Sequence, residues 1–112
     1  MSQSKDDTVR LLHMLEYALK AAAFTKGKSR SDLNDNEMLA MATIHAIEII
    51  GEAASTVSQE LQDRYPKIPW DQIIGTRNRL VHGYIEINLD IIWAIITTDL
   101  PPLISNLKRA LK

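Results

Sequence analysis

Hydrophobic residues recur every three or four positions along most of the chain, the spacing of a helix with one buried face. A first helix is predicted from about residue 7 to 25, since Asp6 or Asp7 can cap its start and Gly27 suits its end. The expected inner face consists of Val9, Leu12, Leu15, Leu19 and Ala22. The polar, turn-rich segment 26–37 then predicts a loop.

A second, long helix is predicted from about residue 36 to 64. Its apolar stripe runs through Met38, Met41, Ile44 or His45, Ile47 or Glu48, Gly51, Ala54, Val57 and Leu61. Glycine in a helix interior costs about 1 kcal/mol relative to alanine. We therefore expect Gly51 to lie at a close contact with another helix, and the neighbouring Glu52 to pair with an arginine.

Proline marks the boundary of the next predicted helix. Pro66 and Pro69 disfavour helix in the residue before each of them, so we expect the second helix to end there. Pro69 also suits the first turn of a third helix, from about residue 70 to 81. The apolar contacts of this helix are expected from Ile73, Ile74 and Leu80.

A fourth helix is predicted after Asn88, which suits its N-cap. Its expected inner face consists of Leu89, Ile92, Trp93 and Ile96. At Pro101 and Pro102 either a new helix begins, or the fourth helix kinks and continues to Leu111. No alternation typical of a strand persists, so the pattern predicts an all-α fold, an up-down bundle of four to five helices.

Length and charge narrow the possible functions. A chain of 112 residues predicts one domain, residues 1–112. The net charge of −1 and the pI of about 6.3 exclude a generally basic nucleic-acid binder, so any polyanion must be held by a local cluster. The polar start lacks the apolar core of a signal peptide, and the apolar runs are too short to span a membrane. With no cysteine present, we expect a cytoplasmic protein.

The densest polar cluster is "GTRNRLVHGY", residues 75–84. Metal-free RNA cleavage needs a base, an acid and a cation. His82 could exchange protons, Arg77 could bind the phosphate, and Asn78 could orient an oxygen or the histidine. Arg77 and His82 are five positions apart, about 140° around a helix. They could converge at a loosened helix end or across a symmetry axis between two copies. Alternatively, the cluster only caps a helix, because helix C-termini favour Arg and His.

The decapeptide contains a spaced motif in which four residues separate Arg77 from His82 and one residue separates His82 from Tyr84. This motif resembles that of the HepT-type toxins of the HEPN ribonuclease superfamily. The resemblance extends to "EIIGEAAS", residues 48–55, and to the segments 64–84 and 89–103. It therefore covers most of the chain from about residue 37 onward.

The resemblance implies a helical bundle that forms a homodimer and acts as a metal-independent endoribonuclease on messenger or transfer RNA, without a cofactor. Arg77 and His82 would be the catalytic pair, with Asn78 in support. Tyr84 would be the tyrosine to which MntA, the nucleotidyltransferase antitoxin of the family, transfers AMP from ATP. RNA, not DNA, is the expected nucleic acid, and Arg79, Arg64 and Lys67 are candidates for binding it.

Two other functions remain open at this point. The chain could be an accessory subunit of a nucleotidyltransferase that binds a nucleotide or RNA without cleaving it. It could also be a helical interaction protein in which the cluster caps a helix; Arg79, for example, is expected to face away from Arg77 as a surface charge. A metal site is not expected, because His45, Glu48 and Glu52 have only His13 and Glu16 as further ligands elsewhere.

Overall fold

The structure is a computed structural model that describes residues 5–82 and 87–112, without the side chains of residues 81 and 82. This part of the chain consists of helices and connecting turns, with no strand, which confirms the all-α prediction. The helices are α1 (Lys5–Thr25), α2 (Asp32–Asp35), α3 (Glu37–Ser55), α4 (Gln59–Arg64), α5 (Trp70–His82), α6 (Leu89–Ala94), the π-helical segment η1 (Ile95–Asp99) and α7 (Leu100–Ala110).

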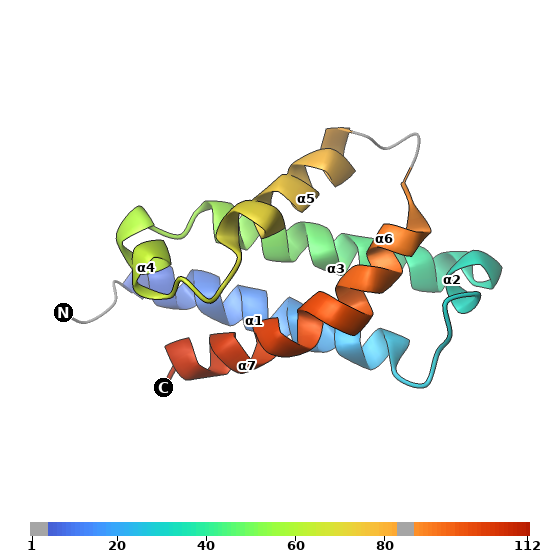
Figure 1. Cartoon of the computed structure of the whole chain (residues 1–112), viewed down its shortest axis with the longest axis horizontal. Helices are drawn as coiled ribbons and strands as arrows, with labels where there is room; N and C mark the ends of the chain where they lie inside the picture. Colours follow the sequence, from blue (N-terminus) through green and yellow to red (C-terminus); the bar gives the residue numbers. More distant parts are fainter. Residues whose placement is uncertain (1–4, 83–86) are drawn as a thin grey trace.

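The bundle is built around α3. This helix packs side by side with α1, which runs in the opposite direction, and α5 crosses it on another side (Figure 1). Helices α6, η1 and α7 form one bent rod that returns along α1, so the start of α1 and the end of α7 lie at the same end of the bundle (Figure 1). Because α3 contacts both α1 and α5, its faces determine where α5 and its polar residues lie.

Two apolar clusters fill the spaces between the helices. The larger cluster joins α1, the second half of α3, α4 and α7, and its fully buried members include Leu11, Met14, Ala18, Leu61 and Leu107. The smaller cluster joins α2, the first half of α3 and the α6–η1 region, through Leu33, Leu39, Ala40, Ile47, Ile92 and Ile96. Burying this apolar surface is the main driving force for forming the bundle.

The prediction for the inner face of α1 is wrong, because the buried positions are shifted by about one residue from the predicted ones. The buried line consists of Asp7, Leu11, Met14, Ala18, Ala21 and Thr25, whereas Leu12 is 50% exposed and Leu19 is 42% exposed. Helix α1 is contacted by both α3 and α7, and the small side chains Ala18 and Ala21 let those neighbours approach. Close approach, rather than the size of the apolar side chain, determines which face is buried here.

The predicted long second helix is also wrong, because it is two helices separated at residues 56–58. Ser58 has an extended backbone and starts α4, its hydroxyl accepting a hydrogen bond from the Leu61 amide at 3.2 Å. The carboxylate of the buried Asp7 accepts bonds from the Ser58 amide at 2.9 Å and the Ser58 hydroxyl at 2.6 Å. This tie to α1 stabilises the helix break. The expected inner residues Met38 and Met41 are exposed.

The proline-marked boundaries agree better with the prediction. Helix α5 begins at Trp70, directly after Pro69, and the buried Trp70 indole donates to the Tyr65 carbonyl at 3.1 Å. Asn88 caps α6 as expected, because its side chain accepts from the Asp90 amide at 2.8 Å. At Pro101 and Pro102 the second alternative is observed: the fourth predicted helix bends and continues, as α6, η1 and α7 without a gap. The π-helical turn η1 absorbs the change of register just before these prolines.

Gly51 lies where α3 and α5 cross, as its interior position predicts. A Cβ atom built at Gly51 would overlap the Cβ of Arg77 and lie 2.9 Å from its Cγ and 3.1 Å from the Ile73 carbonyl oxygen. These atoms belong to the backbone or to the rigid start of a side chain, so they cannot move away without a shift of α5. The absence of a side chain at Gly51 therefore sets the distance between the two helices.

In the described part of the chain, α3 is the one helix long and apolar enough to cross a membrane by length and composition. Half of its apolar window is buried within the protein, against α1 and α5 among others. A central helix of a packed bundle has the same composition, and its place in the fold accounts for the apolar character of α3.

We predict opposite effects of alanine at two helical glycines. Gly51→Ala should destabilise the protein, because overpacking costs about 1–3 kcal/mol and exceeds the gain in helix propensity. Gly75→Ala is the matched control: a Cβ there meets nothing within 4 Å, so the gain of up to about 1 kcal/mol should be realised. Urea unfolding of both variants measures this, and a Gly51→Ala midpoint equal to or above wild type would contradict the close contact.

Candidate functional site

The candidate site lies at the crossing of α3 and α5, around Arg77. The first carbons of the Arg77 side chain lie against Gly51, which fixes the direction in which the chain leaves α5. Its guanidinium then forms an ion pair with Glu52, through Nη2 and Oε2. The other terminal nitrogen, Nη1, donates to Oδ1 of Asn78 at 2.9 Å. Arg77 is therefore held at its stem by one helix face and at its tip by two polar partners.

These contacts leave part of the guanidinium free. The Arg77 side chain is 27% exposed and the Glu52 side chain 54% exposed, so the ion pair lies at the surface. Arginine carries further N–H donors besides the two used here, including Nε–H. No described residue accepts from Nε, so this edge of the planar fork can bind an anion such as a phosphate. Arg77 is thus both oriented and accessible.

The structure places the predicted residues of the decapeptide unequally. The Asn78 side-chain oxygen accepts the hydrogen bond from Arg77. The backbone of α5 remains helical to His82, so the loosened helix end that could bring His82 toward Arg77 is absent up to that residue. The side chain of His82 and the whole of Tyr84 lie outside the described residues.

The three candidate RNA-binding cations lie in two places. Arg79 is exposed on α5 and borders a shallow hollow between α5 and α6, beside Asn88. Arg64 lies at the end of α4, where Nη2 pairs with Glu60 at 3.2 Å, and Lys67 lies in the connector to α5. Arg64 and Lys67 therefore precede the start of α5, whereas Arg77 and His82 belong to its second half. The structure does not bring these two pairs together.

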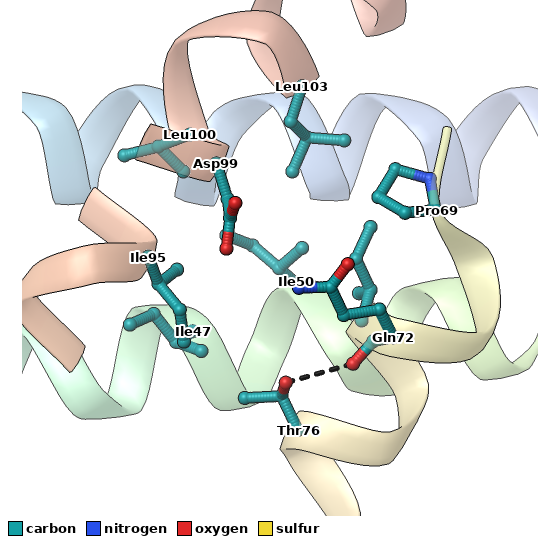
Figure 2. A pocket seen from close by; sticks show the side chains of 10 residues that line it. Ile47, Ile50, Pro69, Gln72, Thr76, Ile95, Asp99, Leu100 and Leu103 are labelled. Carbon is teal, nitrogen blue, oxygen red and sulfur yellow. Dashed lines mark hydrogen bonds between the residues drawn. The ribbon is translucent and has the colours of Figure 1, made fainter. Parts of the chain in front are cut away.

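An apolar hollow lies on the other side of the α3–α5 crossing. It is lined mainly by isoleucine and leucine side chains of α3, α5, η1 and α7, and the Asp99 carboxylate points into it (Figure 2). Thr76, next to Arg77, is turned to this side, and its hydroxyl donates to the Gln72 carbonyl at 2.8 Å (Figure 2). An apolar surface with a carboxylate is unsuited to a phosphate, so we assign the candidate site to the Arg77 side.

Potential metal ligands are scattered in the part of the chain that the structure describes. No three His, Asp or Glu side chains there lie close enough to hold an ion. His45 is exposed on α3 and His13 is exposed on α1.

The predicted pairing of Glu52 with an arginine is confirmed, and the partner is Arg77, which the sequence pattern does not identify. The sequence pattern gives no sign of the apolar hollow, because three separate stretches of the chain, within residues 47–50, 69–76 and 95–103, form it.

Comparison with known proteins places this geometry in context. The family model described as ribonuclease HepT-like matches residues 14–110. A protein of Methanocaldococcus jannaschii, whose name gives RNase as an inferred activity, is 35% identical over 88% of this chain and 91% of its own length. A protein of Caldanaerobacter subterraneus subsp. tengcongensis, named in the same way, is 34% identical with the same coverage.

A third relative carries a more specific name. A protein of Thermococcus cleftensis, named by inference as ribonuclease HepT, is 30% identical over 71% of this chain and 73% of its own length. No solved structure matches the chain. The match to the family model covers the second half of α1 and the helices from α2 to α7, and therefore includes every residue of the candidate site.

Proposed function

This chain belongs to the ribonuclease HepT-like family, and we propose that it is a metal-independent endoribonuclease, the toxin of a toxin-antitoxin pair. Messenger or transfer RNA is its substrate. The proposal is supported by the arrangement of the Arg77 side chain. Its first carbons and its guanidinium are held by described contacts, yet it is partly exposed and keeps N–H donors for an anion. A side chain prepared in this way suits a reaction at phosphorus, where charge develops in the transition state.

In the proposed reaction the RNA supplies its own nucleophile. A base removes the proton from a 2′-hydroxyl, whose oxygen attacks the adjacent phosphorus, while an acid protonates the leaving 5′-oxygen. The products are a 2′,3′-cyclic phosphate and a 5′-hydroxyl. Arg77 neutralises charge on the phosphoryl oxygens, and Asn78 orients the guanidinium. His82 exchanges the protons, because imidazole titrates near neutral pH.

Two copies of the chain complete the proposed site. Because the backbone of α5 stays helical to His82, positions 77 and 82 lie about 140° apart around the helix axis. In a homodimer whose α5 helices face each other across a two-fold axis, His82 of each copy would lie near Arg77 of the other. One histidine then acts as the base and the other as the acid. Residues 1–112 form the single catalytic domain of each copy.

The remaining cations extend the proposed RNA surface. Arg79 is exposed two positions beyond Arg77, about 200° around α5, and would add charge on the side of the helix away from Arg77. Arg64 and Lys67, near the start of α5, would contact RNA farther from the cleaved phosphate. Since the chain has a net charge of −1, such local clusters must supply the phosphate neutralisation on which RNA affinity depends.

A nucleotidyltransferase antitoxin of the MntA type is the proposed partner, in the cytoplasm, where both ATP and RNA are present. The Tyr84 hydroxyl oxygen would attack the α-phosphorus of ATP, forming a phosphodiester to AMP and releasing pyrophosphate and a proton. Tyr84 is two residues from His82 in the sequence. A negative phosphate attached there would compete with RNA for Arg77.

We predict that the protein cleaves a labelled RNA mixture in EDTA, and that Arg77→Ala or His82→Ala lowers the rate by roughly 10²-fold or more. Arg109→Ala and His13→Ala are matched controls, since both residues are exposed on other helices, and should cleave like wild type. Light scattering on the same samples should give the mass of a dimer. A folded dimer that binds RNA through Arg77 but leaves it intact would favour the non-catalytic accessory subunit instead. A monomer with full activity would contradict the two-copy site.

We also predict that co-expression with the neighbouring nucleotidyltransferase, if the genome encodes one, adds AMP to the protein and abolishes cleavage. Intact mass should increase by one or more AMP groups, and Tyr84→Phe should prevent the increase while keeping the nuclease active. Tyr17→Phe, on α1, is the control and should be modified normally. AMP addition to the Tyr84→Phe variant would show that another residue is the acceptor.

A further inference from the structure

We infer that Glu52 is a positioning residue of the candidate active site, which acts by holding the Arg77 guanidinium in the orientation needed at the phosphate. This inference rests on the proposed function, because it assigns Glu52 a role in RNA cleavage. It starts from the ion pair between Arg77 Nη2 and Glu52 Oε2 across the α3–α5 crossing.

The contact requires both helices to be placed as they are. Gly51 lets the first carbons of Arg77 lie directly against α3, and the next residue of α3, Glu52, then reaches the guanidinium. Arginine has several rotatable bonds, and fixing only its stem leaves the fork free to rotate. Among the described residues, only Glu52 and Asn78 hold the fork. Asn78 is its neighbour on the same helix, so Glu52 is the anchor that comes from another element.

A contribution to folding stability does not explain why Glu52 is placed beside Arg77. The Glu52 side chain is 54% exposed, and an exposed pair between flexible side chains contributes little to folding because solvent screens it. RNA affinity is no better a reason, because a carboxylate beside the arginine repels the phosphate. A group that lowers substrate affinity is consistent with catalysis if it orients the arginine for the transition state.

The Glu52→Gln variant should therefore lower kcat for RNA cleavage without lowering the affinity for RNA. The amide retains the size of the side chain and one oxygen acceptor but loses the charge that holds Arg77. We expect kcat for RNA cleavage in EDTA to fall by roughly 10- to 100-fold, with KM unchanged or lower because a negative charge has left the site. The affinity for a non-cleavable 2′-O-methyl RNA should be equal to or higher than that of wild type.

Glu48→Gln is the matched control. Glu48 lies one turn earlier on α3, so its neutralisation changes the net charge equally without removing a described contact to Arg77. It should leave kcat within about twofold of wild type, because substitutions that break no specific contact usually have small effects. Thermal unfolding of both variants verifies that they are folded, and the exposure of Glu52 makes a large loss of stability unexpected.

A second measurement does not depend on cleavage. In protein labelled with ¹⁵N arginine, the Arg77 Nε–H signal is assigned by its loss in Arg77→Lys, and its heteronuclear NOE reports how rigid the side chain is. We expect a rigid Nε–H in wild type and in Glu48→Gln, and a mobile one in Glu52→Gln. These spectra show whether Glu52 holds the guanidinium even in a protein that cleaves no RNA.

The outcomes distinguish the inference from the proposed function. If wild type cleaves RNA and Glu52→Gln keeps its kcat, or loses activity only through a raised KM, the positioning role is overturned. If wild type cleaves no RNA in EDTA, the proposed function fails, and the NOE alone decides the inference. An Arg77 Nε–H equally rigid in wild type and in Glu52→Gln would then overturn it, whereas a mobile one in the variant would support the part concerning Arg77 orientation.

Discussion

The contact between Gly51 and Arg77 is the constraint on which the candidate site depends. Interior glycine weakens α3 as an isolated helix, but it lets α5 approach so closely that the arginine stem lies against the α3 backbone. The same approach brings Glu52 within reach of the guanidinium. The glycine therefore lowers the local stability of α3 but allows a fixed arginine at the surface. Natural sequences depart from local structural preferences in this way at functional sites.

Charge explains why the site must be local. A chain with a net charge of −1 cannot attract RNA with its whole surface, and the Glu52–Arg77 pair neutralises part of its own site. Two copies of Arg77 brought together in the proposed dimer would concentrate positive charge that one chain does not offer. In the same arrangement AMP on Tyr84 would add negative charge where that concentration is highest. Catalysis and its control then depend on one electrostatic feature.

Much of this fold could be predicted from the sequence, because helix boundaries depend on local chemistry. Asn88, Pro69 and the interior Gly51 each act through backbone geometry, and the structure confirms their expected places. Features set by distant residues could not be predicted in the same way. The break between α3 and α4 is stabilised by Asp7, 51 positions from Ser58 in the sequence.

The candidate site shows the same division. That Glu52 would pair with an arginine follows from its place beside a close helix contact. Which arginine it pairs with depends on how far α5 slides and turns along α3, a property of the packed bundle that no local pattern encodes. The buried face of α1 was predicted wrongly for a related reason, since the small Ala18 and Ala21 are buried in place of the larger Leu12 and Leu19.

In the proposed reaction, Arg77 and His82 act on RNA whose own 2′-hydroxyl is the nucleophile. The most direct test is the chemical identity of the new ends, determined by mass spectrometry on a short RNA cleaved in EDTA. We predict a 2′,3′-cyclic phosphate and a 5′-hydroxyl, and no cleavage when the nucleotide at that position is 2′-deoxy. A 3′-hydroxyl with a 5′-phosphate, or cleavage of the deoxy-substituted strand, would mean that water is the nucleophile and would rule out the proposed reaction.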